Sequence, residues 1–255
     1  MLLRSITNHI KEQNWLAVLI DFMIVVVGVF IGIQVANWNE SLAENELSNR
    51  YMEQLTRDIR ADIIDINTSY KTSQWRLAAL SVLLEKSDIA LVNTFYNPER
   101  EVSFPAVSIE EDSIQYLINA STYTRFLDDD RPAYISLVNS GNARLIGKLK
   151  PWPCIQSYYA QYKEVRLFEE RLLLFRTELI RTQHDAGISI AGHLSEEETL
   201  ERIRTNQTLS AAMSSYRLFS FYYMTVLDEL RQRAILLLEL LETNSAQCDF
   251  NTGEL

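Results

Sequence analysis

Glycine, proline, histidine and cysteine are all scarce in this sequence. Its 255 residues include 7 glycines, 5 prolines, 3 histidines and 2 cysteines. Extended sheets need glycine and proline in their many turns, so this scarcity argues against an all-β fold. Leucine, isoleucine, glutamate, arginine and alanine are plentiful instead, and they favour long helices.

Motifs that carry chemistry are missing as well. The sequence has no GxSxG nucleophile motif, no phosphate-binding glycine loop and no CxxC pair. His184 and His193 have no accompanying cysteine or close carboxylate pattern, and the acidic run at 128–130 lacks the spacing of a calcium loop. We therefore expect no catalytic residue, no cofactor and no metal site, which means that the protein is not an enzyme.

Positive charge is also in deficit. The formal net charge is −10 and the pI is about 4.9. Proteins that bind nucleic acid need a basic face for the phosphates, so the composition argues against nucleic acid as a partner.

One apolar run dominates the chain, WLAVLIDFMIVVVGVFIGIQVANW at residues 15–38. The 21 residues from Trp15 to Val35 make a helix of roughly 31 Å, which matches a hydrocarbon core of about 30 Å. Asp21 is its single carboxylate, and the apolar residues outweigh the cost of inserting it. Trp15 and Trp38 stand at the two ends, where tryptophan favours the lipid headgroups. We predict a transmembrane anchor at 15–38.

A cleaved signal peptide is the competing interpretation of this run. The run is longer than the usual length of about 7 to 15 residues, and Gln34 and Ala36 make a poor cleavage site. Arg4 and Lys11 precede the run, whereas three glutamates follow it before the first basic residue, Arg50. The positive-inside tendency therefore predicts a cytoplasmic amino terminus and an extracytoplasmic remainder.

Four parts follow from this interpretation. We expect an amphipathic cytoplasmic arm at 1–14, the anchor at 15–38, a helical extracytoplasmic domain at 39–243 and a polar tail at 244–255.

The acid in the anchor shares a helix face with small residues. At 100° per residue, Asp21 lies on the same side as Gly28 and Gly32, whose spacing allows a second helix to approach closely. An acid in a membrane helix is a candidate functional group because exposure to lipid is unfavourable. This face is the predicted contact for another membrane protein or a second copy of the chain. In the alternative, Asp21 only sets the depth of the helix in the bilayer.

The extracytoplasmic part is predicted to be all-α. A helix running to about Lys86 is indicated by apolar residues at three- and four-residue steps. They are Met52, Leu55, Ile59, Ile63, Ile66, Tyr70, Leu77, Leu80 and Leu84, with charged residues such as Asp58, Asp62 and Asp65 mostly between them. We expect an antiparallel bundle of about four helices, some of them long. A coiled-coil dimer is the alternative use of the same pattern.

Prolines, a glycine and a capping box mark the ends of the predicted elements in the rest of the chain. Residues 93–112 carry two prolines and predict a loop with one extended strand, followed by a helix over 113–127. Pro132 opens the next helix after the acidic run, and Gly141 is a candidate left-handed cap. A long helix at 154–184, a capping box at Ser195 and a long helix from about 206 complete the pattern. The aromatic residues at 154–184 are expected in the core, with an aromatic ligand pocket as the alternative.

The two cysteines are Cys154 and Cys248. In an oxidising compartment an even number of cysteines is compatible with a disulfide. The alternative is two unpaired thiols.

Three stretches carry a resemblance to a known family. DFMIVVVGVFIGIQVANWNE, with the charged helix after it, resembles the opening of an uncharacterised bacterial family of single-pass, membrane-anchored helical proteins. AYISLVNSGNARLIGKLK and the following SYYAQY are similar to that family's internal motif, in which a Ser-Gly-Asn turn joins two helices. The resemblance implies attachment to the bacterial inner membrane and a helical outer domain, with no activity.

Two kinds of function remain from the sequence. The first is a non-enzymatic scaffold or accessory subunit of the bacterial envelope, which contacts other membrane proteins through the face of Asp21, Gly28 and Gly32 and through its outer helical bundle. The second is an extracytoplasmic bundle that binds or senses a small molecule. A proton-coupled, stator-like subunit that uses Asp21 is a weaker third possibility, because the outer domain lacks an obvious anchor to the cell wall.

Overall fold

The computed structural model of the chain describes residues 15–96, 101–105, 108–109, 111, 113–128, 131–147, 149, 151–192 and 194–243. Its described helices and strands are α2 (Trp15–Lys86), β1 (Thr94–Tyr96), β2 (Glu101–Ser103), α3 (Ile114–Thr122), α4 (Pro132–Asn139), α5 (Ala143–Ile146), α6 (Trp152–Asp185), α7 (Glu196–Thr205) and α8 (Gln207–Thr243). The predicted all-α class is confirmed. The predicted arm at 1–14 and tail at 244–255 lie outside the described residues.

The chain divides into two compact units, Met1–Tyr51 and Met52–Leu255, and α2 contributes to both. Its predicted end near Lys86 is confirmed. There the chain turns through Asp88, a non-glycine residue with a positive φ of 58°. The amide of Ile89 donates back to the carbonyl of Leu84 at 3.0 Å, which caps the helix in the manner of a left-handed terminus.

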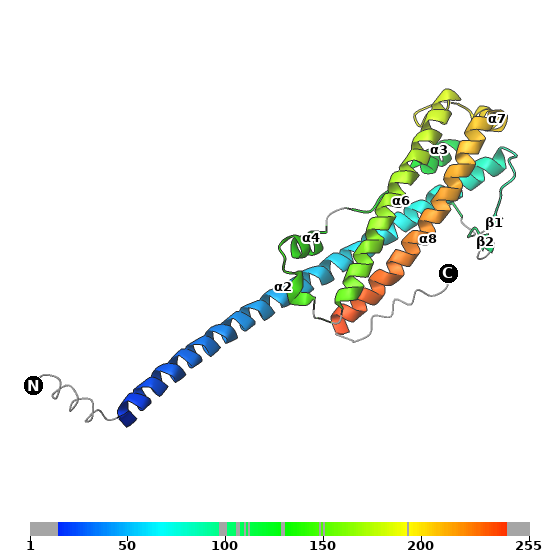
Figure 1. The fold of residues 1–255 in the computed structure, drawn as a ribbon. Coiled ribbons are helices and arrows are strands. Elements are labelled where there is room, and N and C mark those ends of the chain that lie inside the picture. The colour runs from blue at the N-terminus through cyan, green and yellow to red at the C-terminus, as the bar shows by residue number, and fades with distance from the viewer. Residues whose placement is uncertain are drawn as a thin grey trace, which may run out of the picture. The chain divides into compact units, whose positions relative to one another are not determined.

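Three long helices form the second unit. Figure 1 shows α6 and α8 side by side along the later part of α2. The side chains of Arg60 and Glu242 meet at one end of the pair α2 and α8, and those of Ser81 and Arg217 meet near the other, so these two helices are antiparallel. α6 is antiparallel to α8 and runs in the same direction as α2 (Figure 1).

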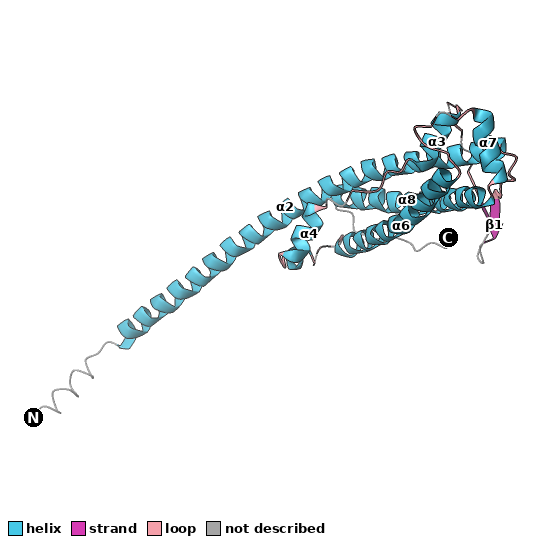
Figure 2. Ribbon diagram, turned by 90° about the horizontal axis from the view of Figure 1, so that it is seen from above, coloured by secondary structure: helices cyan, strands magenta, loops and turns pink. Residues whose placement is uncertain are grey.

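The short elements make the return from the end of α2 to the start of α6. β1 and β2 pair antiparallel, with Thr94 opposite Ser103 and Tyr96 opposite Glu101, where the sequence predicted a single strand. Figure 2 shows α3 and α7 together at one end of the long helices and α4 toward the other end.

Local signals explain several helix boundaries. The capping box predicted at Ser195 is present, because its side chain accepts from the amide of Glu198 while the Glu198 side chain accepts from the amide of Ser195. Pro132 occupies the first turn of α4, and Gly141 has a φ of +72° after its end, as predicted. The helix predicted over 113–127 is shorter than expected, since α3 ends at Thr122 and residues 123–128 are not helical.

The core lies between the three long helices. Leu77 of α2 packs with Phe221 and Met224 of α8, and Phe104 lies against this cluster. On the other side of α8, the rings of Phe175 and Phe219 stack with their centroids 3.8 Å apart. The aromatic residues of α6 therefore serve largely as core, in agreement with the expected role.

This packing predicts the effect of two matched substitutions. Leu77 is 0% exposed and Leu174 is 70% exposed. Leu77→Ala should lower the free energy of unfolding by about 2 to 5 kcal/mol because it leaves a cavity in the core, whereas Leu174→Ala should change it by less than about 0.5 kcal/mol. Urea unfolding of the full chain in a non-ionic detergent, followed by circular dichroism, measures both. Equal effects of the two changes would contradict the described core.

Candidate functional site

The residues predicted to form a membrane contact lie on the first part of α2. Asp21, Gly28 and Gly32 share one helix face, and a Cβ added at either glycine would meet no atom within 4 Å. Trp38 is 65% exposed at the far end of the apolar run. Trp15 begins the helix, and its side chain lies outside what the structure describes.

The cysteines differ in how far the structure describes them. Cys154 is buried in the first turn of α6 and takes part in a disulfide. Cys248, the other cysteine of the sequence, lies outside the described residues. The pairing of these two residues stays a prediction.

A row of three carboxylates on α2 forms the most elaborate polar site of the second unit. Asp58, Asp62 and Asp65 are spaced by four and three residues, so they share one face of the helix. Each of them contacts the segment that leads into α4. Asp58 accepts a hydrogen bond from the amide of Ala133 at 3.0 Å, and Asp65 accepts one from the amide of Asp128 at 2.6 Å.

Asp58 therefore supplies the cap of α4 from another helix. The sequence predicted that the acidic run at 128–130 ends a loop and that Pro132 lies in the first turn of this helix, and α4 does begin at Pro132. Arg131 occupies the N-cap position and makes no side-chain cap of its own. A carboxylate at a helix N-terminus also interacts favourably with the helix dipole.

Asp62 is the central member of the row and is fully buried. It forms an ion pair with Arg131 and accepts a hydrogen bond of 2.8 Å from the hydroxyl of Tyr158. Burial raises the pKa of Asp62 from 3.8 to about 7, against the opposing effects of Arg131 and Tyr158. Burial alone would lower the pKa of Arg131, but the stronger attraction of Asp62 and the neighbouring groups raises it.

The segment between α3 and α4 depends on further side chains of the long helices. Its residues 123–128 form neither helix nor strand, so their buried backbone groups need partners elsewhere. Glu169 of α6 accepts from the amide of Leu127 at 2.8 Å, and Arg166 donates to the carbonyl of the same residue at 2.7 Å. Tyr162 donates to the carbonyl of Asp128 at 2.7 Å.

An arginine of α2 also binds the backbone of residues 123–128. Arg76 is fully buried and donates to the carbonyl of Tyr123 at 3.1 Å and to Ser220 of α8 at 2.8 Å. Its guanidinium lies 5.2 Å from the centre of the Tyr216 ring. Burial lowers the pKa of Arg76, and its hydrogen bonds and this aromatic contact compensate for the lost water.

We call these residues, with the segment that they bind, the polar clasp: Asp58, Asp62, Asp65, Arg76, Arg131, Tyr158, Tyr162, Arg166 and Glu169. The cavities beside α7, beside α8 and beneath residues 188–194 are lined by other residues. In the described part of the chain, no group of three or more His, Cys, Asp or Glu side chains is placed to hold a metal ion. The clasp therefore holds residues 123–128 against α2 and α6.

The sequence did not identify the clasp as a site. It assigned Ile63 to the core stripe and left Asp62 among the charges between core positions, whereas Asp62 is buried and Ile63 is only partly buried. The sequence did contain a signal that Asp62 faces the core, because Ile59, Asp62 and Ile66 follow the same three- and four-residue steps as the apolar residues. The stripe continues through polar residues, namely Ser69, Ser73 and Arg76, all of which are buried.

The raised pKa of Asp62 predicts a pH dependence of stability. The folded chain retains this proton up to a pKa of about 7, while the unfolded chain releases it near 3.8. The stability of the wild type relative to Asp62→Asn should therefore fall as the pH rises from about 4 to 7, by on the order of 4 kcal/mol. Denaturant unfolding of both proteins across this range tests the sign.

Asp185→Asn is the control for this prediction, because Asp185 is exposed and pairs with Arg181 at the surface. That variant should differ little from the wild type in stability, because an exposed ion pair contributes little. A difference between the wild type and Asp62→Asn that stays flat, or that grows with pH, would refute the raised pKa of Asp62.

Comparison with known proteins identifies a family and no close relative. No curated protein and no solved structure matches the chain. Residues 21–150, about half of the 255, match a family of unknown function, DUF6090. The match begins at Asp21 and includes the first two stretches on which the family resemblance was based, together with the whole carboxylate row of α2. The chain belongs to the family of unknown function DUF6090.

Proposed function

We propose that this protein is a non-enzymatic, membrane-anchored scaffold or accessory subunit of the bacterial envelope. One observation carries the proposal: large apolar side chains are exposed all around α2 between Leu19 and Val35, with exposures from 44% at Val26 to 64% at Ile24. Among the described helices, α2 is the one long and apolar enough to cross a membrane. An apolar surface of this extent in water would favour aggregation, and a lipid bilayer covers it.

The proposed location is the inner membrane, with the amino terminus in the cytoplasm and the helical domain in the periplasm or outside. Arg4 and Lys11 before the apolar run support this orientation, because basic residues favour the cytoplasmic side. The orientation also fits the disulfide of Cys154, since an oxidising compartment maintains such bonds.

The proposed contact with other membrane proteins is the face formed by Asp21, Gly28 and Gly32. The space around both glycines leaves room for the backbone of a second helix. A neighbouring helix would also remove Asp21 from lipid, where a carboxylate is unfavourable. The occupant is another membrane protein or a second copy of this chain.

A second candidate function is the binding of a small molecule by the outer domain. A cavity of about 300 Å³ beside α8, lined by Arg217 among other residues, favours it. This volume is at the lower end of the range for small-molecule sites, and helical bundles commonly place such sites between helices.

The anchor and its orientation predict a fractionation and a topology. The full-length chain should remain in the membrane pellet after cell lysis and dissolve only with detergent. A periplasm-active phosphatase fused after residue 255 should be active, and a cytoplasmic fluorescent reporter at the amino terminus should fluoresce. A soluble full-length chain, or the opposite reporter pattern, would overturn the proposal.

The contact face predicts the effect of substitutions in α2. Gly28→Ile and Gly32→Ile should weaken association by at least about tenfold, because each side chain separates the two backbones while meeting no atom of its own chain. Asp21→Asn should weaken the association as well, because the carboxylate lies on the same face as the two glycines. Crosslinking in native membranes, followed by capture of the tagged chain, measures both a second copy and other membrane proteins.

Gln34→Leu is the matched control, because Gln34 is a polar residue on the opposite side of the same helix. It should leave the crosslinked species unchanged. If the three variants and the wild type give the same species in the same amounts, the contact proposed for this face is wrong.

A further inference from the structure

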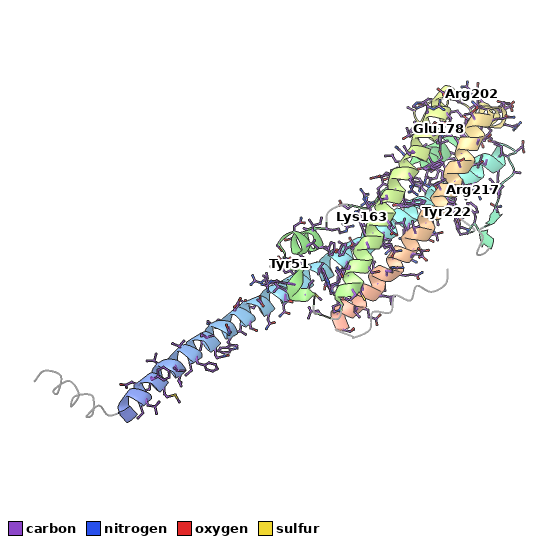
Figure 3. All side chains as sticks on the ribbon, in the orientation of Figure 1. Tyr51, Lys163, Glu178, Arg202, Arg217 and Tyr222 are labelled. Atoms are coloured by element: carbon purple, nitrogen blue, oxygen red, sulfur yellow. The ribbon has the colours of Figure 1, made fainter. Side chains whose placement is uncertain are left out.

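The cavity beside α8 is bounded by four parts of the chain. The end of α2 contributes Leu84, and the segment after it contributes residues 90–92. Phe104 follows β2, while Ser214, Ser215, Arg217 and Leu218 come from α8. Figure 3 shows Arg217 on the side of α8 that faces the strands. The lining is mainly apolar, and its one charged side chain is that of Arg217.

Arg217 is held in place by neutral groups. Its guanidinium donates to Ser81 at 2.7 Å, to the carbonyl of Val92 at 2.9 Å and to the side-chain oxygen of Asn93 at 2.6 Å. It also lies 4.1 Å from the centre of the Phe104 ring. These contacts fix the position of the charge without neutralising it.

The charge of Arg217 has no acidic partner in the described part of the chain. The residue is 6% exposed, yet none of the described ion pairs involves it. Glu85 is the one carboxylate that acts on it electrostatically, and that side chain is exposed and lies outside ion-pair distance. A guanidinium has five N–H donors, and the three hydrogen bonds leave two of them without a partner among the described residues.

We propose that this cavity binds a small monocarboxylate with an apolar tail. The carboxylate would pair with the two available N–H donors of Arg217, whose planar fork matches a carboxylate. The tail would lie against Leu84, Leu91 and Leu218.

The shape and lining of the cavity select this class over other anions. A free phosphate would leave the apolar walls without a partner. An alcohol with the same tail would leave the buried charge of Arg217 uncompensated, and buried charges without partners are unfavourable. A volume of about 300 Å³ admits a medium-length tail and excludes large lipids.

This inference deepens the second candidate function and is independent of the scaffold proposal. Fractionation, topology and crosslinking test the anchor and its contacts, and none of them depends on a ligand. Failure of carboxylate binding would therefore remove the ligand site and leave the membrane scaffold standing.

The experiment uses octanoate as the probe, titrated by calorimetry into the full chain in lipid nanodiscs, with empty nanodiscs as the blank. Wild-type protein should show saturable binding of octanoate at one site. Octanol and inorganic phosphate should each bind at least about tenfold more weakly, because each lacks one of the two recognised groups. No saturable octanoate binding, or equal binding of octanol, would overturn the proposal.

Two variants locate the site. Arg217→Gln should weaken octanoate binding by at least about tenfold, since it removes a charge-assisted hydrogen-bond donor. That change also removes the contacts with Ser81 and Val92 and can destabilise the fold. Ser215→Leu is therefore the second variant, because it fills the cavity from α8 and leaves Arg217 in place.

Ala211→Leu is the matched control, since Ala211 is an exposed residue of the same helix and does not line the cavity. It should bind octanoate like the wild type. Ser215→Leu should lose at least about tenfold in affinity while its thermal unfolding stays close to that of Ala211→Leu. Equal affinities of these two leucine variants would refute the assignment of the site.

Discussion

A loop with no secondary structure of its own is the feature on which the second unit depends. Residues 123–128 lie against both α2 and α6, and Leu127 is almost fully buried there. A buried amide or carbonyl without a partner costs about as much as a lost hydrogen bond. The partners come from side chains, with Asp65 and Arg76 on α2 and Arg166 and Glu169 on α6. These bonds fix where the two parallel helices lie along each other.

Contacts with this loop account for part of the buried charge, because Arg76 and Glu169 bind its backbone. Asp62, Arg76 and Glu169 are each 2% exposed or less, and ion pairs in such positions contribute little net stability because both charges lose their water. Removing one partner is nevertheless strongly unfavourable, since the other charge stays buried alone. In some coiled coils, a buried polar network of this kind favours one alignment of the helices. Arginine suits it, because one guanidinium reaches several acceptors at fixed angles.

The boundary of the family match has a structural meaning. The match ends at residue 150, before α6 begins at Trp152. It includes the loop and the carboxylate row of α2, whereas Tyr158, Tyr162, Arg166 and Glu169 lie beyond it. In the folded chain, the half beyond the match supplies the partners for the amide and carbonyl of Leu127 and for the carbonyl of Asp128. Two buried arginines differ in their surroundings. Arg76 is enclosed by the bundle, while Arg217 borders a cavity.

Much of the helical architecture was available from the sequence by itself. Hydrophobic periodicity, the capping box at Ser195 and the glycine at 141 are local signals, so they predict α2, α6, α7 and α8 within a few residues. The apolar run at 15–38 likewise has a length and composition that depend on no other part of the chain. Only the tertiary structure decided that Asp62 is buried and that α3 stops at Thr122. Both depend on groups far away in the sequence, since the partners of Asp62 are Arg131 and Tyr158 and the chain after α3 is held by side chains of α6.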